Sequence, residues 1–346
     1  MSSDITPPAY NTDSSPGRKH RDLPKFLDYD FSNLEFRIGS FYAFIFSRCK
    51  DANVTVVARS NYETVKAHGL KLNSIVHGDH IVRFDRVLSS PAKAGRTFDY
   101  VVCAHKAIDE DNSAGSLACV IDPQKITVVL IQNGIGIEEP FRQAFPPMTI
   151  ISCVTWTGAK QIELGVVQHL ERWEGLQIGL YSGSACDESR DRQSLDIFAA
   201  LLQQGGTRYE VVPDIQQLRW KKIVSNAAWN PITTLTQMKT HAWLQSSPDA
   251  LPLTRKLMTE VVTIAQKAGV DLDPNTPGLI LEEMINNASV GSSMFNDLVA
   301  GKPMEVEPIL GKPLRKAREL GVDAPILETL YTLVTAVNIR SKQAVK

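Results

Sequence analysis

Short runs of apolar, mostly β-branched residues alternate with helical or loop-like segments between about residues 36 and 210. Continuous apolar runs of this length are typical of strands that are buried on both faces of a parallel sheet. The expected strands cover residues 54–58, 100–104, 126–131 and 148–153. The pattern therefore predicts an α/β, Rossmann-like domain over residues 26–212.

The pattern changes after about residue 213, where long amphipathic segments with acidic starts and basic ends take over, such as 253–268 and 309–320. Apolar positions that recur at helical spacing indicate helices with one buried face. We therefore expect an all-helical domain over residues 213–346. Residues 1–25, rich in Ser, Pro and Asp, are expected to form a disordered tail.

Composition excludes several classes of function. The formal net charge of the chain is −1, which argues against nucleic acid or a membrane surface as the main partner. Its five cysteines lack CxxC spacing and its seven histidines form no ligand-spaced cluster, so we expect reduced thiols, no metal site and a cytoplasmic protein. Apolar helices such as 326–337 can pack within the subunit or between the subunits of a homodimer.

Three polar residues stand four apart near the middle of the chain: Lys222, Asn226 and Asn230. A helix places residues at this spacing on one face, while apolar neighbours such as Ile223 and Ala227 occupy other faces. The stripe predicts a buried polar site with one proton donor and two amides. A solvated helix face with a chance repeat is the alternative.

One feature of a dinucleotide site is incomplete. Gly39 resembles the last glycine of a Gly-rich turn that leads into a helix. The two earlier glycines of the fingerprint are replaced by Leu34 and Phe36, and residues 26–33 are too polar and irregular for the expected first strand. The sequence therefore predicts a degenerate first strand and phosphate turn.

Three further residues follow expected strands, where the carboxyl edge of a parallel sheet meets its ligands. Arg59 follows the 54–58 strand and offers a charge partner for the additional phosphate of NADP. Lys106 and Asn133 follow the next two strands. A solvated arginine and ordinary turn residues are the alternatives.

Two motifs together resemble the ketopantoate reductase (2-dehydropantoate 2-reductase) family over about residues 36–340. The first is the Lys222, Asn226, Asn230 stripe, which is followed by Pro231. The second is Ser292-Ser293-Met294 with Asp297, followed by Glu305 twelve residues after Ser293. Lys106, Asn133 and Arg59 match cofactor-side positions of the family, and Arg59 matches its NADPH-selecting arginine.

The resemblance implies that NADPH reduces a 2-oxo acid, 2-dehydropantoate or a related substrate, to a 2-hydroxy acid. Lys222 would donate the proton, with Glu305 as the second catalytic residue. Burial lowers the pKa of a lysine, whereas a nearby carboxylate raises it. Asn226, Asn230 and Ser293 would bind the substrate. Taken alone, Glu305 is equally well interpreted as a helix-surface residue and Ser293 as a helix N-cap.

The chain departs from the family pattern in two ways. Leu310 stands before Gly311, where members that serve pantothenate synthesis usually have Asn, which suggests a more apolar 2-oxo acid. The missing first strand predicts weak NADPH binding or none. Two alternatives stay open: a non-catalytic metabolite-binding protein, and a dehydrogenase of the 2-hydroxy-acid or 6-phosphogluconate type.

Overall fold

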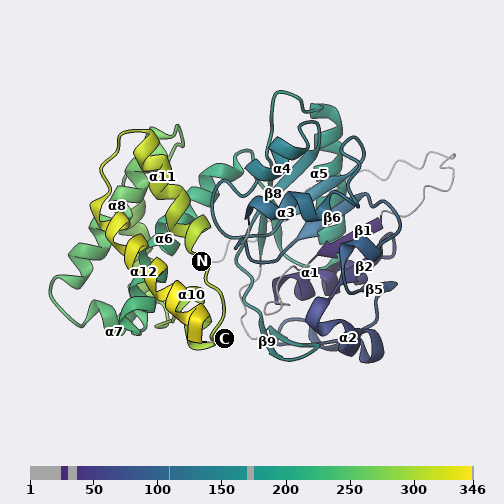
Figure 1. The fold of residues 1–346 in the computed structure, drawn as a ribbon, viewed down its shortest axis with the longest axis horizontal. Helices are drawn as coiled ribbons and strands as arrows, with labels where there is room; N and C mark the ends of the chain where they lie inside the picture. The colour runs from purple at the N-terminus through teal and green to yellow at the C-terminus, as the bar shows by residue number, and fades with distance from the viewer. Residues whose placement is uncertain (1–24, 30–36, 109, 170–174, 345–346) are drawn as a thin grey trace, which may run out of the picture.

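The computed structural model describes residues 25–29, 37–108, 110–169 and 175–344. Figure 1 shows two halves side by side: a sheet with its covering helices, coloured purple to teal, and a group of helices, coloured green to yellow. Helix α6 (Ile215–Thr236) is the first element of the helical half. The expected division into a Rossmann-like and a helical half is confirmed.

The larger sheet has eight strands in the order β12-β11-β8-β7-β6-β1-β2-β5. Six neighbouring strands of this sheet run parallel to one another: β8, β7, β6, β1, β2 and β5. Strand β11 is antiparallel to β8. This is the doubly wound arrangement, whose order reverses between β1 and β6. All four expected strands belong to this sheet, whose members are β1 (Lys25–Tyr29), β2 (Asn53–Val57), β5 (Arg86–Leu88), β6 (Tyr100–Cys103), β7 (Thr127–Leu130), β8 (Thr149–Thr155), β11 (Leu176–Leu180) and β12 (Tyr209–Val211).

The first strand, which we expected to be absent, is present. Strand β1 lies between β2 and β6, with Phe26 opposite Val54 on one side and Tyr100 on the other. Backbone partners on both edges override a weak local pattern, which explains why the prediction was wrong. The prediction of weak NADPH binding therefore loses the support of a missing first strand. Positions 34 and 36 of the turn, and residues 1–24 of the expected tail, lie outside the described residues.

Helices cover both faces of the sheet. The side chains of α1 (Ile38–Ser47) and α5 (Glu188–Gly205) belong to one apolar core, and those of α3 (Glu110–Leu117) and α4 (Glu139–Ala144) to another. Within β6, neighbouring side chains alternate between the two cores, as expected for a strand buried on both faces. The remaining helical segments of this half are η1 (Arg59–Asn61), α2 (Tyr62–His68) and η2 (Pro91–Lys93).

A smaller sheet lies against α1. Its strands have the order β4-β3-β10-β9, and the ring of Phe41 on α1 lies 4.8 Å from the ring of His169 at the end of β10. The strands are β3 (Leu70–Ser74), β4 (Gly78–Val82), β9 (Lys160–Glu163) and β10 (Val166–His169).

The helical half is built around α6. The Asp214 carboxylate caps this helix by accepting hydrogen bonds from the backbone N–H groups of Gln216 (2.9 Å) and Gln217 (3.3 Å). Apolar residues of α6 form a core with the later helices. These helices are α7 (Thr240–Leu244), α8 (Ala250–Lys267), α9 (Thr276–Asn286), α10 (Ser293–Val299), the π-helical η3 (Glu307–Gly311), α11 (Lys312–Glu319) and α12 (Pro325–Ala344).

A buried ion pair joins the two halves. Arg219 of α6 is 2% exposed, and its Nε lies 2.9 Å from Oε1 of the fully buried Glu138. The guanidinium also donates to the carbonyl oxygens of Gln132 and Gly134, both at 2.9 Å, and of Cys153 at 3.0 Å. One side chain therefore fixes α6 to the loop after β7 and to β8.

The same loop approaches the helical half closely at Gly134. Its φ of 103° lies in the region that favours glycine, and a Cβ atom there would collide with Pro308 of η3, lying 2.9 Å from the Pro308 carbonyl oxygen. The neighbouring Ile135 N–H donates to that oxygen at 3.3 Å. We call the contact region between the sheet half and the helical half the seam. The seam requires glycine at position 134.

We expect Gly134→Ala to destabilise the protein by about 1–3 kcal/mol more than Gly78→Ala, because only the first substitution overpacks the seam. Gly78 is a matched control: its φ is 84°, and nothing lies within 4 Å of an added Cβ. Urea unfolding of both variants measures the difference. Equal losses would show that the close approach to Pro308 does not matter.

Arg219→Met should lower the free energy of unfolding by about 3–5 kcal/mol, because it leaves the Glu138 carboxylate buried without its cation. Arg315→Met removes a pair with Glu307 whose side chains are 48% and 42% exposed, and should cost no more than about 1 kcal/mol. Adding Glu138→Gln to Arg219→Met should recover part of the loss in urea unfolding. If the free energy of unfolding does not recover, the unpaired charge of Glu138 is not the main cause of the loss in Arg219→Met.

Candidate active site

A cavity of about 310 Å³ lies between the carboxyl ends of β6, β7 and β8 and helices α6 and α10. It brings together six residues that the sequence singled out from distant segments. They are Lys106, Asn133, Lys222, Asn226, Ser293 and Glu305. Arg37, Thr155 and Trp156 also line it.

Lys222 points from α6 to the end of β8. Its Nζ donates to the carbonyl oxygen of Thr155 at 2.5 Å and lies 5.2 Å from the centre of the Trp156 ring. The pKa of Lys222 is lowered to about 8, chiefly by burial and also by the positive charge of Arg219, while the charge of Glu305 acts in the opposite direction. A lysine with this pKa exchanges its proton near neutral pH.

Glu305 is held by the other half of the molecule. It is 5% exposed, which excludes the interpretation as a helix-surface residue. Its Oε2 accepts from Asn133 Nδ2 at 3.2 Å, and its Oε1 accepts from the backbone N–H of Ala107 at 3.4 Å. Asn133, expected on the cofactor side, thus also positions the carboxylate.

The two adjacent serines have different positions. Ser292 is the N-cap of α10, and its Oγ accepts from the Phe295 N–H at 3.1 Å and from Thr233 Oγ1 at 2.7 Å. Ser293 is exposed and lines the cavity. The capping role considered for Ser293 therefore belongs to its neighbour.

Three expected residues lie outside the cavity lining. Asn230 is 3% exposed, one turn beyond Asn226, and its Nδ2 has no hydrogen-bond partner among the described residues. Gly39 is buried in the first turn of α1, and Arg59 follows β2 in η1 with a φ of 40°.

Leu310 does not make the cavity more apolar. It is fully buried in the core of the helical half and is absent from the described residues that line the cavity. The inference of a more apolar substrate from this position is therefore not supported.

The sequence analysis did not single out Arg219 or Arg37. Arg219 stands three residues before Lys222, so extending the polar stripe of α6 by one turn would have found it. Arg37 carries no spacing signal, and only the fold brings it to the cavity.

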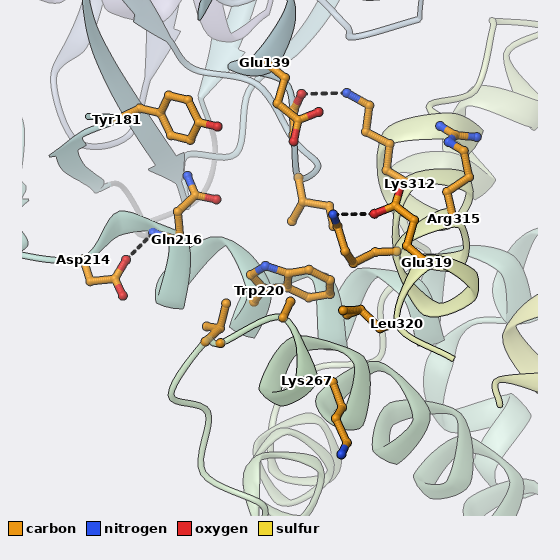
Figure 2. Close-up of a pocket in the computed structure, with 16 residues that line it drawn as sticks. Glu139, Tyr181, Asp214, Gln216, Trp220, Lys267, Lys312, Arg315, Glu319 and Leu320 are labelled. Carbon is orange, nitrogen blue, oxygen red and sulfur yellow. Dashed lines mark hydrogen bonds and ion pairs between the residues drawn. The ribbon is translucent and has the colours of Figure 1, made fainter. Parts of the chain in front are cut away.

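A second cavity, of about 570 Å³, opens elsewhere along the seam, where α11 faces Trp220 and Gln216 of α6 (Figure 2). Basic residues of α11 are engaged by neighbouring groups. Lys312 donates to the Gly136 carbonyl oxygen at 2.7 Å, and Lys316 pairs with Glu319 at 2.6 Å. None of the expected site residues is among the described residues that line it, so the smaller cavity is the candidate active site.

No helix within the described part of the chain is both long enough and apolar enough to cross a membrane. Across the same residues, His, Cys, Asp and Glu side chains form no group of three or more suited to a metal ion.

Both halves of this chain are similar to known proteins. The family model "Ketopantoate reductase PanE/ApbA" matches residues 37–183, and "Ketopantoate reductase PanE/ApbA C terminal" matches residues 214–338. The 2-dehydropantoate 2-reductase of Archaeoglobus fulgidus is 30% identical over 288 residues, 82% of this chain and 90% of that protein. That of Nostoc sp. is 28% identical over 283 residues, 81% of this chain and 86% of that protein.

The crystal structure of 2-dehydropantoate 2-reductase from Methylococcus capsulatus superposes with a TM-score of 0.80 at 29% identity and covers 92% of this chain and 98% of that one. The two family models together span most of the chain, including every residue of the candidate site. The chain therefore belongs to the ketopantoate reductase family.

Proposed function

We propose that this chain reduces a 2-oxo acid to a 2-hydroxy acid with NADPH, the substrate being 2-dehydropantoate or a related acid. One observation carries the proposal: Lys222, with its pKa lowered to about 8, faces the same cavity as Glu305, Asn226 and Ser293. A proton donor whose pKa lies near the working pH suits general acid catalysis.

The size of the cavity supports a small substrate. About 310 Å³ is at the lower end of the range for ligand sites in proteins. Hydroxyl, amide, carboxylate and ammonium groups converge there, which fits a short acid with several oxygen atoms.

The described residues also fit a dinucleotide. Strand β1 leads towards the N-terminus of α1 beside the point where the strand order reverses, which is where dinucleotides bind in this fold. Lys106 and Asn133 line the cavity from the adjacent strand ends, and Arg59 directly follows β2, where it favours a 2′-phosphate. A bound nicotinamide cofactor supplies the hydride.

The residues of the chain orient the substrate and supply its proton. Lys222 Nζ, held by the Thr155 carbonyl, donates to the keto oxygen and releases its proton as that oxygen gains charge. Ser293 Oγ donates to the carboxylate, and the Asn226 amide orients the remaining oxygens. The Glu305 carboxylate accepts a substrate hydroxyl and keeps Lys222 protonated.

Replacing Lys222 with Ala should lower the rate of NADPH oxidation with 2-dehydropantoate by about 10²–10⁴-fold, because the general acid is lost. Lys221→Ala is the matched control, since this neighbouring lysine is exposed and does not line the cavity. The measurement follows NADPH absorbance with a panel of 2-oxo acids, and repeats it with NADH. A folded protein that is stabilised by the acid but oxidises no cofactor would instead be a binding protein.

The rate of reduction should fall as the pH rises through about 8, because Lys222 must be protonated to act as the acid. The reverse oxidation needs the neutral amine, so its rate should rise through the same pH. Glu305→Gln removes the charge that raises the pKa of Lys222, and should therefore shift the falling limb to lower pH. A shift to higher pH in kcat profiles would contradict this assignment.

A further inference from the structure

A third cavity opens beside the candidate active site. Its volume is about 680 Å³, and it lies between the β9–β10 hairpin and α10. Arg37, Gly158 and Ala159 line both this cavity and the candidate active site. Gly158 and Ala159 contribute no more than a methyl group, so the loop between β8 and β9 leaves the two spaces contiguous. The third cavity is therefore an extension of the candidate active site.

Helix α10 leads from one space into the other. Ser293, its first residue, lines the candidate active site, whereas Phe295 and Val299 line the third cavity. Residues four apart share one face of a helix, so Phe295 and Val299 present neighbouring apolar side chains. The helix rises about 9 Å from Ser293 to Val299, which is the span of a chain of several carbon atoms. A ligand whose acid group contacts Ser293 can therefore extend along this face.

The apolar residues of this face are accessible to a ligand. Val299 is 69% exposed, and Phe295 is only partly buried. The Phe295 ring lies against Gly291, where an added Cβ would stand 2.6 Å from the ring Cδ1 atom. Removing such apolar surface from water is favourable, and exposed apolar surface beside a cavity is typical of a ligand-binding groove. This face therefore favours an apolar group.

The charges around the third cavity narrow the choice of ligand. The described residues that line it include Lys160 and Lys302 but no carboxylate, which disfavours a positively charged group. Lysine side chains can cover apolar surface with their methylene stems while the ammonium group stays in water. An uncharged apolar group is therefore compatible with these lysines. A second carboxylate on the ligand is the alternative that an experiment has to separate.

We propose that the third cavity binds the side chain of the 2-oxo acid, and that the preferred substrates carry an apolar chain that reaches Phe295 and Val299. This rests on the proposed function, which places the carboxylate and the keto group of the substrate in the candidate active site. The smaller cavity then holds only the reacting end of the acid. Phe295 and Val299 determine specificity for the length of the chain.

The test measures kcat/KM at saturating NADPH for 2-oxobutanoate, 2-oxopentanoate and 2-oxohexanoate. Each added methylene should raise kcat/KM about fourfold, because it is transferred from water to an apolar surface. 2-Oxoadipate has the same chain length as 2-oxohexanoate but carries a second carboxylate. It should be the poorer substrate of the two.

Two variants connect the chain-length dependence to α10. Val299→Asn places an amide on the apolar face, and Phe295→Ala removes the ring. Both should lower kcat/KM for 2-oxohexanoate about 10-fold and leave 2-oxobutanoate nearly unchanged. Val290→Asn is the matched control, because Val290 is also exposed, at 47%, and lines neither cavity. Thermal unfolding confirms that each variant is folded.

Three kinetic results would overturn the proposal. They are equal kcat/KM for the three acids, a preference for 2-oxoadipate over 2-oxohexanoate, and a chain-length dependence that persists in both folded α10 variants. A rise in the Kd of NADPH in these variants, measured by calorimetry, would assign the cavity to the cofactor and also overturn the proposal.

Unreactive analogues separate this failure from failure of the proposed function. Oxamate resembles the reacting end of a 2-oxo acid, and N-butyloxamate adds an apolar chain. A protein that reduces no 2-oxo acid, yet binds N-butyloxamate more tightly than oxamate and loses this difference in Val299→Asn, would overturn the proposed function and support the binding site. A protein that reduces 2-oxo acids without regard to chain length would do the reverse, and one that neither reduces the acids nor binds the analogues would overturn both.

Discussion

The buried contact between Arg219 and Glu138 determines where the candidate active site forms. The Arg219 guanidinium binds the carboxylate and four carbonyl oxygens at the end of the sheet, which fixes the rotation of α6 about its own axis. Lys222 and Asn226 follow on the same face of the helix, so they are presented to the strand ends. A buried ion pair of this kind adds little net stability compared with apolar packing, but it specifies one arrangement of the two halves among several that apolar contact alone would permit.

The same contact affects the chemistry of the site. Arg219 stands close enough to Lys222 for its charge to favour the neutral amine, while the charge of Glu305 favours the ammonium. Arg219 therefore both fixes the position of α6 and lowers the pKa of Lys222 on the same helix. Glu305 depends in turn on Asn133 and Ala107 from the sheet half. Neither half holds a complete site, so the relative placement of the two halves controls both the geometry and the proton affinity of Lys222.

Much of this could be predicted from the sequence, because periodicity and spacing are local properties. The four apolar strands and the polar stripe on α6 were found in this way. Strand β1 was missed because residues 25–29 acquire their strand character from β2 and β6 rather than from their own composition. Arg37 and Asp297 lie 260 residues apart and meet only after the halves pack, so no spacing rule connects them. Asn230 has the correct spacing, yet one further turn of the helix carries it past the cavity.

Strand β1 also makes the large sheet dependent on the beginning of the chain. It separates five strands on one side from two on the other. A chain shortened past residue 29 would keep every residue of the candidate site, yet β2 and β6 would face each other as open edges across the width of one strand. Unpaired edges of this kind accept strands from other molecules. For this protein, the loss of residues 1–29 would therefore cause aggregation before it affected any catalytic group.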